Sequence, residues 1–187
     1  GLGRWAYYDA HRSVWEGPSA GTIDEELRTA DVFLNISGAT TMRPWLEQVP
    51  RRVFVDTDPG FTQVRNLEVA ADRSLAAAHT DFFTFGELFG QPGCSLPDDG
   101  FPWRPTRQPL ALDAWPLPTP AGKGPFTTVM RWDSYVVRRH HGLELGMKSR
   151  SFQPFLDLPA DSPVDLEIAL GGPAPESDLR ARGWRIR

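Results

Sequence analysis

The sequence has little of what marks secreted or membrane-spanning proteins. Its 187 residues include one cysteine, Cys94, so no disulfide can form within the chain and a reducing compartment is expected. No apolar run approaches the ~20 residues that a membrane-spanning helix needs. No segment has the basic start and apolar middle of a signal peptide. We therefore expect a cytoplasmic protein without a transmembrane segment.

Positive charge is not in excess either. The chain carries 20 Lys and Arg against 24 Asp and Glu, a net charge of −4, and has no basic stripe of the kind that contacts nucleic-acid phosphates. The nearest candidate, Arg138–His141, is short and typical of an exposed surface turn. The cysteine and the histidines show no spacing typical of a zinc site. The sequence therefore predicts no nucleic-acid partner and no metal.

What the chain does contain is a short apolar run that ends in two acids and a tight turn. The run reads Val53-Phe54-Val55-Asp56-Thr57-Asp58-Pro59-Gly60. This pattern is typical of a buried parallel strand followed by a Pro-Gly turn. Open α/β sheets bind their ligands at the carboxyl ends of such strands. Asp56 and Asp58 are therefore expected where a ligand would bind.

Strands and helices alternate along residues 1–90. Thr22-Ile23-Asp24-Glu25 is a capping box, which predicts a helix to about Ala30. Apolar runs predict strands over 31–36, 52–56 and 79–85, with helical turns over 42–48, 61–68 and 87–90. This order is typical of a parallel doubly wound sheet.

Prolines interrupt the pattern between residues 91 and 125. They exclude a long helix or a central strand there, but the segment is too apolar for a free linker, so we expect an arm that lies against a domain. From residue 126 strands are expected over 127–132, 165–170 and from 183, with helices over 149–156 and 176–182. The chain thus divides into an N-terminal unit (1–90), a proline-rich bridge (91–125) and a C-terminal unit (126–187).

An Asp-x-Asp at a strand end fits several chemistries. A nucleoside hydrolase opens with the same Asp-x-Asp-Pro-Gly, but the two further acids of its calcium site are absent from Phe61-Thr62-Gln63. A phosphoaspartate phosphatase needs a flexible loop where Pro59 and Gly60 make a rigid turn. A metal-dependent sugar-nucleotide transferase uses Asp-x-Asp to bind an ion and a diphosphate, but three residues are a weak signal. An alternative is that Asp56 or Asp58 caps the turn by accepting backbone N–H bonds. Capping and a direct catalytic role both stay open.

Several segments in one order resemble bacterial glycosyltransferase-like proteins with two facing Rossmann-type domains, the GT-B arrangement. They include Ala30–Gly38, Arg52–Gln63, His79–Glu87, Leu96–Trp103, Thr128–Trp132 and Gly146–Ser149. The resemblance implies an α/β fold of two Rossmann-type parallel-sheet units, both incomplete. The glycine-rich turn of the first domain would precede Gly1, and the acidic donor loop of the second would follow Arg187. We therefore expect a fragment that is not active alone.

The resemblance also implies roles for particular residues. A nucleotide-sugar donor is expected on the C-terminal unit, where Arg131 and Lys148 would hold its diphosphate, since a guanidinium grips phosphate bidentately and an ammonium adds a point charge. Asp56 and Asp58 are candidates for the base that deprotonates the acceptor hydroxyl, or for acceptor contacts. The candidates for lining the acceptor cleft are Asn35, Ser37 and Gly38.

Other conspicuous side chains are expected to be structural. His79 precedes its strand, which places it at the edge opposite Asp56. The tryptophans around the bridge, Trp103, Trp115 and Trp132, are expected to pack rather than to stack on a sugar.

The function predicted is that of a metal-independent glycosyltransferase without a cofactor, which moves a sugar from a nucleotide-sugar donor to an unknown acceptor. The alternative is a non-catalytic protein of the same fold that binds a nucleotide or a glycan.

Overall fold

The chain forms two units, each built on a parallel sheet of its own. The computed structural model describes residues 3–115, 117 and 124–187, and the units are Gly1–Gln108 and Pro109–Arg187. The expected mixed α/β class with parallel sheets is confirmed. Residues 91–108, which composition placed in the bridge, belong to the first unit. Residues 116 and 118–123 of the expected bridge lie outside the described residues.

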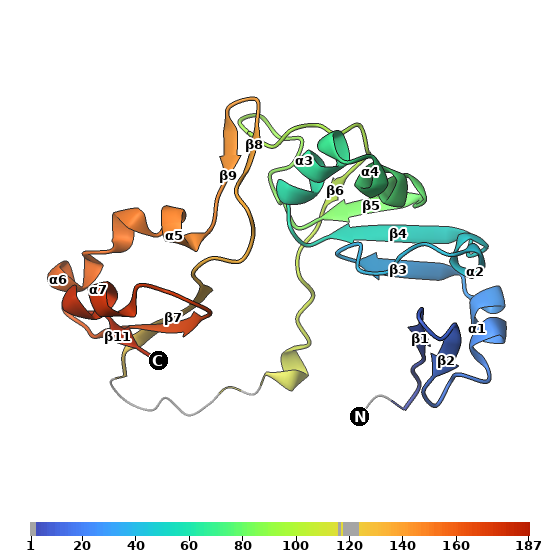
Figure 1. Ribbon diagram of the computed structural model, residues 1–187, viewed down its shortest axis with the longest axis horizontal. Coiled ribbons are helices and arrows are strands. Elements are labelled where there is room, and N and C mark those ends of the chain that lie inside the picture. The colour runs from blue at the N-terminus through green and yellow to red at the C-terminus, as the bar shows by residue number, and fades with distance from the viewer. Residues whose placement is uncertain (1–2, 116, 118–123) are drawn as a thin grey trace. The chain divides into compact units, whose positions relative to one another are not determined.

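The first unit contains a four-stranded parallel sheet in the order β3-β4-β5-β6, with helices α3 and α4 on one face (Figure 1). A hairpin of β1 and β2 precedes this sheet. The elements are β1 (Tyr7–Asp9), β2 (Val14–Glu16), α1 (Ile23–Thr29), β3 (Val32–Ile36), α2 (Pro44–Glu47), β4 (Arg51–Asp56), α3 (Phe61–Glu68), α4 (Ala70–Ala77), β5 (Asp81–Thr84) and β6 (Arg104–Pro105).

The strands expected in the first unit are confirmed as β3, β4 and β5. Helix α1 begins after Thr22 as predicted, but the Thr22 hydroxyl contacts the Glu26 carboxylate and makes no capping bond. The short helix expected over 87–90 is a turn. Helix α4 has no counterpart in the prediction, because its Ala-rich sequence has high helix propensity but few large apolar residues to mark a period.

Aromatic rings fill the space between the first sheet and its helices. The buried cluster consists of Phe54, Ala76, Phe82 and Trp103. The Trp103 ring lies edge-on to Phe54 and to Phe82, with centroids 5.5 and 5.3 Å apart. Trp103 precedes β6, so this packing fixes the end of the long β5–β6 loop against the sheet.

The second unit contains a three-stranded parallel sheet in the order β11-β10-β7. Its core consists of Met130, Trp132, Ile168, Leu179 and Trp184. Its elements are a 3₁₀ turn (Leu112–Ala114), β7 (Phe126–Arg131), β8 (Arg138–His140), β9 (Leu143–Leu145), α5 (Lys148–Ser151), a second 3₁₀ turn (Gln153–Phe155), α6 (Leu158–Asp161), β10 (Leu166–Gly171), α7 (Glu176–Ala181) and β11 (Arg185–Ile186).

The three strands and two helices expected in the second unit are present, although the helix over 149–156 is split into α5 and a 3₁₀ turn. The basic stretch at 138–141, expected as a surface turn, forms part of the β8–β9 hairpin. Packing is confirmed for Trp103 and Trp132, each 7% exposed, but not for Trp115, which is 70% exposed. No helix within the described ranges is long and apolar enough to cross a membrane.

Replacement of Leu179 by Ala tests the core of the second unit. Leu179 on α7 is fully buried, so we expect Leu179→Ala to lower the free energy of unfolding of this unit by about 2–5 kcal/mol. Urea denaturation followed by hydrogen exchange of β10 peptides measures the change. The control is Leu158→Ala, whose side chain is 46% exposed. Equal losses in both variants would contradict the packing.

Candidate functional site

Asp56 ends β4 and is fully buried. Its Oδ1 accepts the backbone N–H of Asp58 at 2.9 Å and the hydroxyl of Thr62 at 2.7 Å. Its Oδ2 accepts Nε2 of Gln63 at 3.0 Å and the hydroxyl of Thr84 at 2.7 Å. One carboxylate therefore joins the turn after β4, the first turn of α3 and the end of β5.

These four bonds favour a structural role for Asp56. A carboxylate offers about four acceptor sites, and the groups that surround Asp56 use both of its oxygens, so an acceptor hydroxyl has no room to approach. The turn is closed further by Gln63, whose Oε1 accepts the N–H of Gly60 at 2.6 Å. Gly60 has a φ of 92°, a conformation that a glycine adopts without strain. Asp56 thus caps the turn, as one of the two interpretations of the sequence proposed.

A second buried carboxylate holds the next turn of α3. Asp99, 2% exposed, accepts Nδ2 of Asn66 at 2.7 Å through Oδ2 and the indole N–H of Trp103 at 2.8 Å through Oδ1. Arg73 on α4 donates to the Asp99 carbonyl at 2.9 Å. Asp99 lies in the β5–β6 loop, so this cluster ties α3, α4 and that loop together.

Asp58, unlike Asp56, is exposed. Partial burial of its carboxyl and the nearby charge of Asp56 raise the pKa of Asp58, while Arg65 opposes the shift. A carboxylate with a raised pKa and an open approach is the better proton acceptor. Of the two candidate bases, Asp58 is therefore the one that solvent reaches, and its role as a base stays a prediction.

Asn35, a candidate for the acceptor cleft, lies in the interior. It is fully buried, and its amide exchanges two hydrogen bonds with the backbone of Thr40, at 2.9 and 3.0 Å. Its Nδ2 also lies 3.1 Å from Nε2 of His79. Nδ1 of His79 lies 2.9 Å from the carbonyl oxygen of Leu75. Asn35 therefore orders the loop after β3 rather than lining a cavity.

His79 is structural, as expected. It is 6% exposed, and its two bonds fit a neutral ring that donates from Nδ1 and accepts at Nε2. Burial lowers the pKa of His79, because the charged form is disfavoured away from water.

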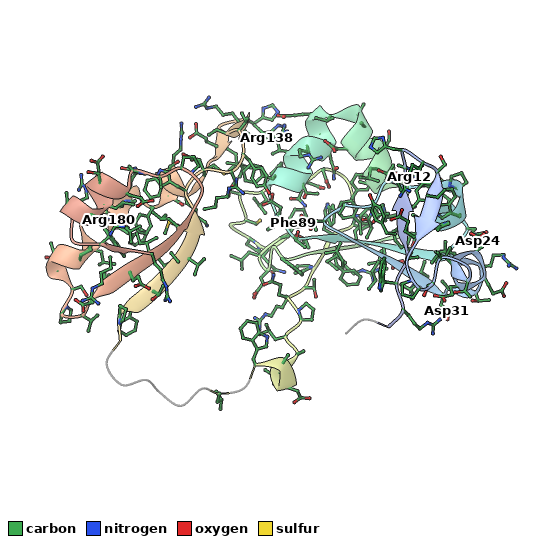
Figure 2. All side chains as sticks on the ribbon, turned by 60° about the horizontal axis from the view of Figure 1, so that its bottom comes forward. Arg12, Asp24, Asp31, Phe89, Arg138 and Arg180 are labelled. Carbon is green, nitrogen blue, oxygen red and sulfur yellow. The ribbon has the colours of Figure 1, made fainter. Side chains whose placement is uncertain are left out.

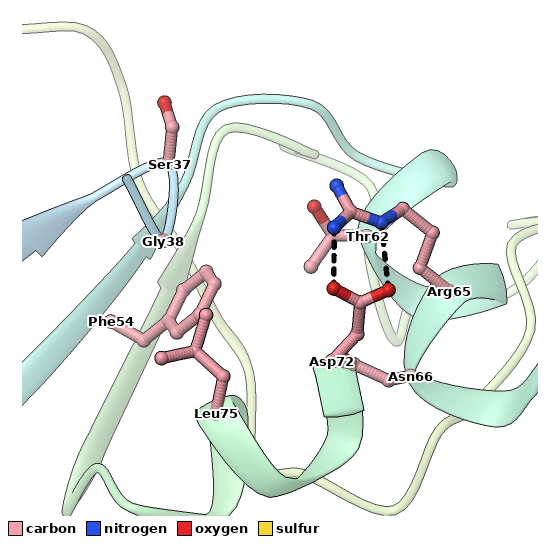
Figure 3. A pocket seen from close by; sticks show the side chains of 8 residues that line it. All are labelled: Ser37, Gly38, Phe54, Thr62, Arg65, Asn66, Asp72 and Leu75. Carbon is pink, nitrogen blue, oxygen red and sulfur yellow. Dashed lines mark hydrogen bonds and ion pairs between the residues drawn. The ribbon is translucent and has the colours of Figure 1, made fainter. Parts of the chain in front are cut away.

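Ser37 and Gly38 do line a cavity, of about 70 Å³ (Figure 3). They form a tight turn after β3, in which the N–H of Ala39 donates to the carbonyl of Ile36 at 3.1 Å. The cavity is lined by both apolar and polar side chains. Its other lining residues are Phe54, Thr62, Arg65, Asn66, Asp72 and Leu75.

Two charged groups of this cavity, Arg65 and Asp72, were not among the residues selected from the sequence. They form a two-pronged ion pair, in which Nε of Arg65 donates to Oδ2 of Asp72 at 3.0 Å (Figure 3). The pair joins α3 to α4. Since α4 was not predicted, nothing in the sequence pattern placed Asp72 beside Arg65. The cavity has room for about two water molecules, or for one polar substituent of a larger ligand.

In the second unit, Arg131 and Lys148 lie at the same end of the sheet. Arg131 ends β7, beside Gly171 of β10, and its Nε lies 3.5 Å from the point where a Cβ on Gly172 would stand. Lys148 begins α5, and the next residue, Ser149, donates its N–H to the Trp132 carbonyl at 3.0 Å. Both cations are exposed. They therefore occupy the carboxyl edge of this sheet, where ligands of open α/β sheets bind.

Within residues 3–115, 117 and 124–187, no three His, Cys, Asp or Glu side chains are grouped so that they could hold a metal ion. Independence of a metal therefore stays a prediction from the sequence. Comparisons of the chain with models of protein families, with curated proteins and with solved structures found no match.

Substitution of Asp56 tests its structural role. Asp56→Asn places an amide N–H₂ opposite donors such as Gln63 Nε2, so we expect the free energy of unfolding of the first unit to fall by about 1–3 kcal/mol. Hydrogen exchange of β4 and β5 peptides measures this loss of stability. The matched control, Asp58→Asn, should leave stability unchanged or raise it slightly at neutral pH, because the raised pKa means that folding disfavours the charged Asp58 carboxylate. Equal losses in both variants would refute the distinction.

His79 should make the stability of the first unit depend on pH. Its pKa in the folded protein is below the unfolded value of about 6.5, so the stabilisation is complete above about pH 6.5 and is lost as the pH falls below it. We expect His79→Gln to be less stable at neutral pH and to lack this slope below about pH 6.5. The control His11→Gln, at an exposed position, should keep the slope. A wild-type stability that is flat over this range would contradict the assignment.

Proposed function

We propose that this chain is part of a glycosyltransferase-like protein of the GT-B arrangement, in which the second unit binds the diphosphate of a nucleotide sugar and the first unit faces the acceptor. The observation that carries the proposal is the placement of Arg131 and Lys148 at one edge of the second sheet. Two exposed cations at the carboxyl edge of one parallel sheet suit a diphosphate better than a neutral ligand.

The chemistry assigned to these residues is charge stabilisation. When an acceptor oxygen attacks the anomeric carbon of the sugar, the bond to the diphosphate breaks and negative charge develops on the leaving group. A guanidinium and an ammonium held at that position lower the energy of this charge. Gly172, whose φ of 77° favours glycine, forms the bend after β10 beside Arg131.

On the first unit, Asp58 is the residue to which we assign the proton of the acceptor hydroxyl. Its exposed carboxylate and raised pKa support this assignment. Ser37, Gly38 and Arg65 line the small cavity near the same edge of the first sheet, and they would contact a polar substituent of a bound acceptor.

Nucleotide binding by variants of the whole chain tests the proposal. Calorimetric titration with UDP, GDP, ADP and dTDP should reveal binding of at least one of them. Arg131→Ala should weaken that binding by more than about tenfold, equal to about 1.4 kcal/mol, and Lys148→Ala should weaken it in the same direction. The matched control is Arg182→Ala, since Arg182 is exposed and precedes β11, at the other end of the sheet.

Two results would overturn the assignment. One is the absence of binding by all four nucleotides, and the other is an affinity that Arg131→Ala leaves unchanged. A nucleotide sugar that binds through Arg131, but is neither transferred nor hydrolysed by the full-length protein, would support the non-catalytic alternative.

A further inference from the structure

The loop between β5 and β6, residues 85–103, contains two adjoining cavities. Their volumes are about 350 and 420 Å³, within the range of sites for small molecules. They share Phe89, Cys94 and Leu96, and together we call them the β5–β6 groove. Figure 2 labels Phe89 on this loop.

The groove is built by an ordered loop at the carboxyl end of β5. Successive turns are closed by backbone bonds from Phe89 to Gly86 at 2.9 Å, from Gln91 to Leu88 at 3.0 Å and from Cys94 to Gln91 at 3.1 Å. At its far end the loop is held by the buried Asp99 and Trp103. A ligand would therefore meet a wall that exists before it binds, which reduces the entropy lost on binding.

The lining indicates the chemistry of the ligand. Phe85, Leu88, Phe89 and Phe101 give it an apolar and aromatic surface, suited to a flat ring. The acid Asp98 also lines the groove, and its Oδ1 accepts the N–H of Gly100 at 2.8 Å. A carboxylate has further acceptor sites, so it favours a donor on the ligand and disfavours an anion.

We propose that the β5–β6 groove binds a small aromatic molecule that carries a hydroxyl or amino group and no negative charge. If the proposed function holds, this molecule is the sugar acceptor; that part of the inference rests on the proposed function, whereas the binding site itself does not.

The only cysteine of the chain gives a direct readout, because Cys94 lines both cavities and is partly exposed. The probe is 2-naphthol, and the measurement is the rate at which a disulfide reagent such as 5,5′-dithiobis(2-nitrobenzoate) modifies Cys94 in the whole chain. We expect saturating 2-naphthol to slow the modification by at least about fivefold, with a single binding curve. The anion 2-naphthoate should bind at least about tenfold more weakly, because Asp98 is among the residues that line the groove and like charges repel.

A matched pair of variants separates the groove from the rest of the surface. Leu88→Asp changes an exposed side chain of the groove, 71% exposed, and Leu110→Asp changes one that lies outside it, 68% exposed. Neither position is buried, so both variants should fold. We expect Leu88→Asp to weaken 2-naphthol binding by at least about tenfold and Leu110→Asp to leave it unchanged.

The proposal is overturned if 2-naphthol does not slow the modification of Cys94, or if it protects Cys94 in Leu88→Asp as well as in the wild type. It is also overturned if 2-naphthoate binds as tightly as 2-naphthol. Arg131→Ala, in the other unit, should retain the protection. Protection of Cys94 by 2-naphthol without any nucleotide binding would support the groove as a binding site and refute the proposed function. Nucleotide binding without protection would refute the groove alone.

Discussion

The attachment of α3 to two buried carboxylates is the constraint on which the rest of the first unit depends. Gln63 and Asn66 face inward from this helix, where apolar residues are usual, and each donates to a buried acid, Asp56 or Asp99. A buried carboxylate is costly unless its oxygens are hydrogen-bonded. A helix displaced by one turn would remove the bonds that Thr62 and Gln63 donate to Asp56 and the bond that Asn66 donates to Asp99. The polar interior thus sets the position of α3 more narrowly than apolar packing alone.

The positions of the exposed functional groups follow from this attachment. Asp56 fixes the turn that presents Asp58 to solvent, and α3 carries Arg65 to the cavity lined by Ser37 and Gly38. Through Asp99 and Trp103 the same helix anchors the β5–β6 loop, and hence the groove that contains Cys94. The buried acids Asp56 and Asp99 therefore determine where the exposed groups of the first unit lie.

The sequence predicted the alternation of strands and helices and the strand end at Asp56, because period and turn residues are local signals. It could not distinguish Asp56 from Asp58, since the bonds that use both Asp56 oxygens come from Thr62 and Gln63 on the next helix and from Thr84, 28 positions away. Asn35 was misplaced for a similar reason, because its partner His79 is 44 positions distant. The ion pair Arg65–Asp72 also depends on a contact between elements, and its second partner lies on α4, a helix without an apolar period that would predict it. The groove at residues 85–103 likewise depends on contacts between elements. The position of Arg131 at the end of β7 could be predicted because strand ends are local signals, whereas the binding role of Arg131 and Lys148 stays a prediction.

In the first unit buried acids organise the fold, and in the second unit we propose that the exposed cations Arg131 and Lys148 bind an anion. Hydrogen exchange measured on the whole chain, with and without the nucleoside diphosphate that binds best, tests this division most directly. The account predicts slower exchange in peptides that cover residues 131–133, 146–150 and 171–173, with the peptides over 56–66 unchanged. Protection over 56–66 with none at the edge of the second sheet would contradict it.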